Sequence, residues 1–162
     1  MNPIRLSVLG TALFVVTGVI ATIDVDRPQV FVAVSLVEFA VGTIVFAYAF
    51  LRAVGRSRTE TIGIGGLFFG AGSAPRNVRT VLVGSFAVQT VAAIVFASIR
   101  LYTSLAFGVL APMWALGFTG LWVSIHGTFP PREPEPTRAA RRSAASGREE
   151  SPPAPRDEQD AG

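Results

Sequence analysis

Glu38 is the residue with the clearest capacity for chemistry, because it interrupts a long apolar run, VFVAVSLVEFAVGTIVFAYAF. An ionisable side chain inside a membrane-spanning helix is costly, and such residues commonly mark proton or ion sites. Gln89 interrupts the third apolar run of the chain, and Thr17 and Ser35 supply hydroxyl groups in the first and second runs. Counted at about 1.5 Å per helical residue, Thr17 reaches the depth of Glu38, and Gln89 lies near mid-membrane. We therefore predict an intramembrane polar site formed by Glu38, Gln89 and Thr17.

The predicted polar site has two interpretations. In the first, Glu38 is a proton or cation site, with its carboxyl group kept neutral by the cost of placing a charge in hydrocarbon. In the second, Glu38 is part of a structural hydrogen-bonded clasp between helices, which contributes roughly 0.6 to 2 kcal/mol. Arg100, at the end of the third apolar run, is a candidate ion-pair partner of Glu38.

Other reactive residue types are scarce. The chain has no cysteine, which excludes disulfides, thiolate metal sites and cysteine nucleophiles. His126 is the single histidine, which excludes multi-histidine metal and haem sites, and we expect it to lie at the membrane interface beside Trp122. No catalytic constellation is evident, so we predict a non-enzymatic protein without catalytic residues, metal or cofactor.

The elements that position these residues follow from composition. Half of the residues are hydrophobic, mean hydropathy is +0.49 and only 15% are charged, compared with about 25% in an average soluble domain. About 20 apolar residues suffice to cross a hydrocarbon core of about 30 Å. Four segments meet this length, at residues 4–23, 29–51, 78–99 and 104–125. We predict an all-α fold, an integral membrane four-helix bundle.

Two of the four segments carry further expectations. Segment 4–23 has an alternative interpretation as a cleaved secretory signal peptide whose basic start is Arg5, although its apolar run exceeds the usual 7 to 15 residues. In segment 104–125, Pro112 removes a backbone hydrogen bond and clashes with the preceding turn, which predicts a kink.

The loop at 52–77 determines the predicted orientation. It contains one acid, Glu60, and most of a cluster of arginines that we expect to contact lipid head groups: Arg52, Arg56, Arg58, Arg76 and Arg79. Arginine collects in short cytoplasmic loops. We therefore predict a multi-pass protein of the cytoplasmic (plasma) membrane with both termini in the cytoplasm.

The glycine-rich part of this loop, at 61–72, is too short to span a membrane and too rich in glycine for a stable helix. It is expected to lie at the interface or to form a re-entrant loop buried in protein.

The sequence divides at residue 126. The membrane domain covers 1–126, and residues 127–162 are rich in proline, arginine and glutamate with few apolar side chains. Such a segment cannot bury enough surface to offset its chain entropy. We predict a disordered cytoplasmic tail at 127–162.

Within 67–132, the runs LFFGAGSAPRNVR, SLAFGVLAPMWALGFTGLW and HGTFPPR resemble a family of small, uncharacterised four-helix membrane proteins of high-GC Gram-positive bacteria. The resemblance implies a membrane location and a four-helix architecture, and it transfers no site residue.

Two functional hypotheses follow. The first is a non-enzymatic interaction or assembly protein of the cytoplasmic membrane, with membrane lipids and either a protein partner or further copies of itself as its contacts, and without nucleic acid. The second is a small proton-coupled transporter that works as an oligomer around Glu38.

Overall fold

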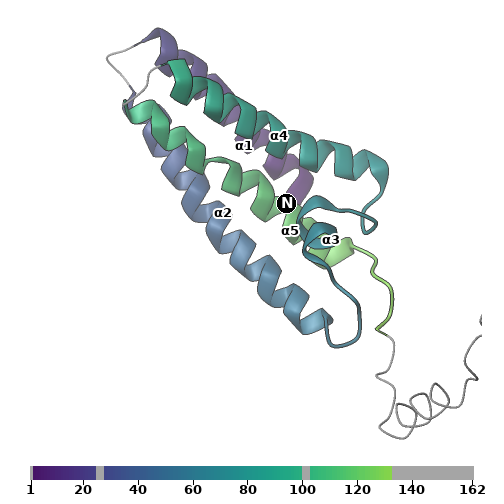
Figure 1. Cartoon of the computed structure of the whole chain (residues 1–162). Coiled ribbons are helices and arrows are strands. Elements are labelled where there is room, and N and C mark those ends of the chain that lie inside the picture. The colour runs from purple at the N-terminus through teal and green to yellow at the C-terminus, as the bar shows by residue number, and fades with distance from the viewer. Residues whose placement is uncertain (1, 25–27, 100–102, 133–162) are drawn as a thin grey trace, which may run out of the picture. The chain divides into compact units, whose positions relative to one another are not determined.

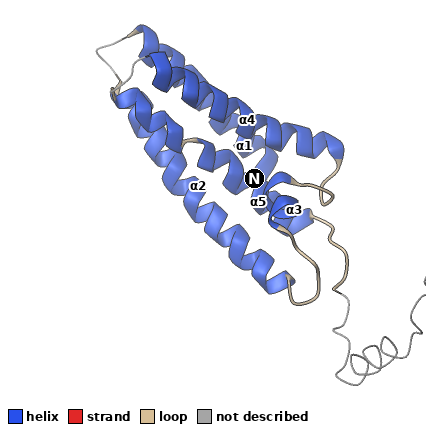
Figure 2. Cartoon of the chain, in the orientation of Figure 1, coloured by secondary structure: helices blue, strands red, loops and turns tan. Residues whose placement is uncertain are grey.

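The computed structural model describes residues 2–24, 28–99 and 103–132. The described residues form α1 (Pro3–Ile23), α2 (Gln29–Arg56), α3 (Ile64–Phe69), α4 (Arg76–Ile99), the 3-10 helix η1 (Ser104–Leu110) and α5 (Pro112–His126). In the bundle, α2 packs against α5 and α1 packs against α4 (Figure 1). Figure 2 shows that helices account for most of the described chain. The predicted all-helical fold with four long apolar segments is confirmed.

The largest difference between the predicted and observed helix boundaries is at the C-terminal end of α2. Predicted segment 29–51 continues as α2 to Arg56, and the N–H of Ser57 still donates to the carbonyl of Ala53 at 2.8 Å. α1 begins at Pro3, where the Asn2 side chain accepts from the N–H of Ile4 at 3.0 Å and caps the helix.

The fourth predicted helix is divided at the expected proline. Residues 104–110 form η1, and α5 begins at Pro112. Proline has no N–H to donate and is well suited to the first position of a helix, where that group has no partner. The prediction of one kinked helix over 104–125 is therefore wrong in detail: proline starts a new α-helix after a 3-10 segment.

The long helices bury small and polar residues together with some phenylalanines, and they leave many large apolar side chains exposed. On α2, Ser35, Glu38, Gly42 and Ala49 are buried, whereas Ile44 is 69% exposed. The exposed large side chains of the four spans include Leu9, Leu13, Val16, Ile20, Val37, Ile44, Leu51, Val91, Ile94 and Phe107. Water would oppose this arrangement, and lipid would favour it.

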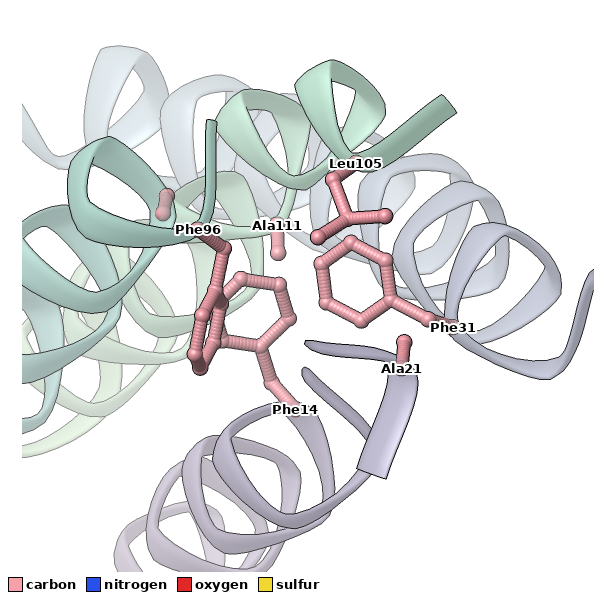
Figure 3. Close-up of a cluster of buried hydrophobic side chains, with 7 residues drawn as sticks. Phe14, Ala21, Phe31, Phe96, Leu105 and Ala111 are labelled. Atoms are coloured by element: carbon pink, nitrogen blue, oxygen red, sulfur yellow. The ribbon is translucent and has the colours of Figure 1, made fainter. Parts of the chain in front are cut away.

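An aromatic cluster fills the bundle at the end where α1 runs into α2. The rings of Phe14, Phe31 and Phe96 come from α1, α2 and α4, with centroid separations of 5.3, 5.9 and 5.8 Å (Figure 3). Leu105 and Ala111 complete the cluster from the η1 and α5 side. Tilted and edge-on ring pairs of this kind are favourable beyond the area that they bury. The cluster thereby fixes three helices relative to one another.

A second cluster lies at the other end and contains α3. Leu67 and Phe68 are buried with Ala53 and Val123, and the Phe68 ring stacks on Phe46 at 4.4 Å. The prediction that segment 61–72 is too rich in glycine for a helix is wrong, because tertiary burial of these two side chains offsets the low helix propensity. α3 ends at Gly70, whose φ of 60° is readily adopted by glycine.

The chain after α5 returns along the loop rather than leaving the bundle at residue 127. The N–H of Thr61 donates to the carbonyl of Pro130 at 2.9 Å, the N–H of Arg132 to Thr59 at 2.9 Å, and the N–H of Thr128 to Ser73 at 3.1 Å. The first compact unit accordingly ends at Arg132. The predicted boundary at 126 is six residues too early, and the rest of the predicted tail, 133–162, lies outside the described residues.

We refer to residues 57–75 and 127–132 together as the end cap. Arg56 ties this region to the bundle: its guanidinium donates to the carbonyls of Ser124 and Gly127, both at 3.0 Å. It also forms an ion pair with Glu60 at 2.8 Å, and the ring of Phe129 lies 5.5 Å below it. Carbonyls at a helix C-terminus lack intrahelical partners, so a cation there is favourable.

Candidate functional site

Glu38 and Gln89 meet in the interior of the bundle. Glu38 lies on the narrow buried face of α2 and is 3% exposed, and Gln89 lies on α4 and is 0% exposed. The Nε2 atom of Gln89 donates to Oε2 of Glu38 at 3.1 Å. The predicted pairing of these two residues is thus present as a hydrogen bond between α2 and α4.

Gln89 also reaches a third helix. Its Oε1 atom accepts from the backbone N–H of Ala115 at 3.3 Å. The break before Pro112 explains why this N–H is available, because the carbonyl of Ala111 accepts instead from Trp114 at 2.9 Å. We call Glu38, Gln89 and the Ala115 N–H the polar clasp. It joins α2, α4 and the first turn of α5.

Helices α2 and α5 approach closely beside the clasp. A Cβ atom on Gly42 would lie 2.6 Å from the backbone of Met113 and Trp114, and one on Gly117 would lie 2.5 Å from the carbonyl oxygen of Gly42. Only glycine permits this backbone contact, which is a common way for membrane helices to pack. The close contact holds the N-terminal turn of α5 within reach of Gln89.

The two oxygens of the Glu38 carboxyl group differ in their hydrogen bonding. Within the described residues, Oε1 of Glu38 is buried without a hydrogen-bond partner. The hydroxyl of Ser35, one turn away on α2, donates to the carbonyl of Phe31 at 2.9 Å, so its proton is used within its own helix. The clasp therefore keeps an acceptor that no group of the described residues satisfies.

Thr17 does not join the clasp. Its hydroxyl donates within α1, to the carbonyl of Leu13 at 2.8 Å and that of Phe14 at 3.1 Å. Hydroxyls of threonine in helices often bond back to the preceding turn in this way. Residue count along the helix predicts only a depth for Thr17, and it does not specify the partner of this buried hydroxyl group. Arg100, the predicted ion-pair partner, lies outside the described residues.

The five arginines of the predicted cluster differ in how many of their nitrogens the protein itself engages. Arg52 and Arg56 are used by the protein itself, because Nε of Arg52 donates to the carbonyl of Ser124 at 3.3 Å and Arg56 anchors the end cap. Arg58, Arg76 and Arg79 are exposed, as is Arg52, and Nε of Arg79 donates to the carbonyl of Phe69 at 3.1 Å. The role of Arg56 could not be predicted from the sequence, because it depends on where the C-terminus of α5 lies.

His126 lies at the exposed end of α5. Its ring stacks on Trp122 with centroids 5.1 Å apart, and Nδ1 lies 3.2 Å from the Trp122 carbonyl oxygen. His126 thus lies beside Trp122, as predicted. Among the described residues, no group of three potential metal ligands comes together.

Comparisons with protein-family models, with curated proteins and with solved structures find no match to this chain. The assignment of function therefore depends on the geometry of the bundle and the end cap.

Proposed function

We propose that this protein is an integral protein of the cytoplasmic membrane that acts without catalysis, through contacts with a protein partner or with further copies of itself. Four described helices are long and apolar enough to span a bilayer. Their outward faces carry the large apolar side chains, and their inward faces carry Glu38 and Gln89. Burying the polar groups and exposing the apolar ones is favourable only where the surrounding solvent is hydrocarbon.

The proposed orientation is supported by the end of the bundle at which the arginines gather. Figure 1 places the N-terminus near α3 and the C-terminal part of α5, at the end of the bundle opposite the α1–α2 connection. The same end carries Arg52, Arg56, Arg76 and Arg79. Excess arginine near helix ends favours the cytoplasmic side. The proposal therefore places both ends of the 132-residue unit, and the end cap, in the cytoplasm.

The end cap is the observation that carries the interaction proposal. It is held in one arrangement by the Arg56 contacts, by the pairing of residues 59–61 with 130–132, and by the hydroxyl of Ser73, which donates to the Gly66 carbonyl at 2.6 Å. Its surface includes Ile64, which is 75% exposed. A surface that is ordered before binding avoids much of the entropic cost of association.

The polar clasp favours the same conclusion. Transport by a carboxylate requires that the group change partners during a cycle, whereas Gln89 engages both its amide nitrogen and its amide oxygen across three helices. Such a bridge stabilises one packing of the helices. The clasp then serves to keep the bundle, and with it the end cap, in a fixed shape.

A photo-crosslinking amino acid placed at Ile64 in cells tests the proposal. The expected result is a discrete product of higher mass, either with a foreign chain or with a second copy. The matched control is the same amino acid at Ile94, which is 58% exposed on the apolar side of α4. Equal products from both positions, or none from Ile64 and further exposed positions of the end cap, would contradict the proposal.

One observation supports a second function, a proton-coupled transporter. Oε1 of Glu38, which has no hydrogen-bond partner among residues 2–24, 28–99 and 103–132, is the kind of buried acceptor to which a transported proton or cation would bind. This function predicts proton flux through the reconstituted protein that the Glu38→Gln variant abolishes, whereas the interaction protein conducts none.

A further inference from the structure

We propose that the outer face of α4 binds one anionic phospholipid, with its phosphate at Arg76 and Arg79 and one acyl chain over Gly84. This inference relies on membrane insertion, which is part of the proposed function, and goes beyond it by naming a lipid class and a site.

The site is a surface hollow of about 550 Å³. Its lining comes entirely from α4: Arg76, Arg79, Thr80, Val83, Gly84 and Ala87. These positions recur every three or four residues and so lie on one face of the helix. From the first to the last, the hollow extends about 16 Å along the axis, roughly half the thickness of the hydrocarbon core. This is the depth to which one leaflet reaches.

The lining changes from charged to apolar along that length. Arg76, Arg79 and Thr80 occupy the end at the predicted cytoplasmic interface, and Val83, Gly84 and Ala87 follow toward the membrane centre. A phospholipid has the same order of groups, from phosphate to acyl chain. Guanidinium groups bind phosphate with strong, charge-assisted hydrogen bonds. The charge and the polarity of the hollow therefore both match an anionic lipid.

Arg76 and Arg79 keep guanidinium nitrogens that are not bonded to the protein, unlike Arg56, whose Nε and both terminal nitrogens are all engaged. Nε of Arg79 donates to the carbonyl of Phe69 at 3.1 Å, which holds the guanidinium in place and leaves its two terminal nitrogens. Among the described residues, the guanidinium of Arg76 has no hydrogen-bond or ion-pair partner, and this side chain is exposed. One fixed and one open guanidinium thus flank the mouth of the hollow.

Gly84 provides the space for the chain. A Cβ atom built on Gly84 has no heavy atom within 4 Å, so open space lies beside the helix at this point. A large side chain here would fill the hollow without displacing protein atoms. Gly55 on α2 is equally open and lies away from the hollow, which makes it a matched control.

Native mass spectrometry of the full chain, titrated with phosphatidylglycerol and phosphatidylcholine, tests the site. The wild type should retain one phosphatidylglycerol in preference to phosphatidylcholine. Each arginine near an anionic lipid contributes roughly a fivefold change in affinity. Arg76→Gln should therefore weaken retention about fivefold, and Arg58→Gln, on an exposed side chain outside the hollow, should leave it unchanged.

The steric pair completes the test. Gly84→Phe should displace the retained lipid, and Gly55→Phe should not. Equal loss in the Arg76 and Arg58 variants, or full retention by Gly84→Phe, would overturn the site. A dimer that Gly84→Phe dissociates would identify a second copy as the occupant and would also overturn it.

Flotation of each variant with liposomes distinguishes failure of the proposed membrane insertion from failure of the proposed lipid site. Wild-type protein that does not float would contradict membrane insertion itself. Normal flotation without lipid preference would reject only the α4 site.

Discussion

The Gln89→Leu substitution should destabilise the bundle strongly, because leucine approximates the volume of glutamine but cannot bridge α2 and α5. The variant loses the 3.1 Å bond to Glu38 and the 3.3 Å bond from the Ala115 N–H. Interhelical hydrogen bonds in membrane proteins contribute roughly 0.6 to 1.7 kcal/mol each. Leaving a buried carboxyl oxygen and a buried N–H without partners adds to the loss. We expect a decrease in the free energy of unfolding of about 2 to 4 kcal/mol.

Unfolding by sodium dodecyl sulfate in lipid bicelles, followed by circular dichroism, measures this decrease. Val88→Leu is the control, since Val88 is the neighbouring residue on α4 and is 50% exposed. Glu38→Gln retains a carbonyl oxygen that accepts from Gln89, so its free energy of unfolding should decrease by less than about 1 kcal/mol.

A double variant sharpens the comparison. The Glu38→Leu/Gln89→Leu double variant removes both partners of the hydrogen bond. Its decrease in the free energy of unfolding should be smaller, by about 1 kcal/mol or more, than the sum of the decreases in the Glu38→Leu and Gln89→Leu single variants. Additive losses, or a Gln89→Leu variant as stable as Val88→Leu, would refute the view that the clasp holds the helices together.

Three further predictions concern the packing, the end cap and the topology. Gly42→Ala should cost about 1 to 3 kcal/mol in the same assay, because its methyl group would lie 2.6 Å from the backbone of α5, whereas Gly55→Ala should be tolerated. Arg56→Gln should speed amide hydrogen exchange in the end cap while leaving the helix interiors protected, and uniform protection in both regions would show that Arg56 is not the anchor. Because the chain has no cysteine, single cysteines report topology without background. Thr59→Cys should react with an impermeant maleimide only after the cells are opened, and Asp24→Cys in intact cells; the reverse pattern would invert the orientation.

The sequence predicted the helices well because their signal is local. A run of about 20 apolar residues requires helix in a membrane, where every backbone group must find a partner within the segment. The pairing of Glu38 with Gln89 was also predictable, since two isolated polar groups in hydrocarbon have few other partners. Thr17 shows the limit of such reasoning, because its hydroxyl satisfies itself within α1.

The parts that sequence reasoning missed depend on contacts between distant segments. The Ala115 N–H became a partner only because Pro112 starts a new helix after η1. Within segment 61–72, α3 (Ile64–Phe69) forms because Leu67 and Phe68 pack against α2 and α5. Helix propensities contain no information about such tertiary contacts. The ordered return at 127–132 likewise arises from pairing with residues 59–61. Composition alone classified both stretches as irregular.

Proton flux in proteoliposomes tests most directly whether Glu38 holds the helices together rather than carrying protons. Wild-type protein and the Glu38→Gln variant are reconstituted at equal density, an acid pulse is applied, and the internal pH is followed with a trapped dye. We predict that both give the leak rate of protein-free liposomes. Wild-type flux above that leak, abolished in Glu38→Gln while the variant remains folded by circular dichroism, would contradict the structural role of the clasp and establish the transporter.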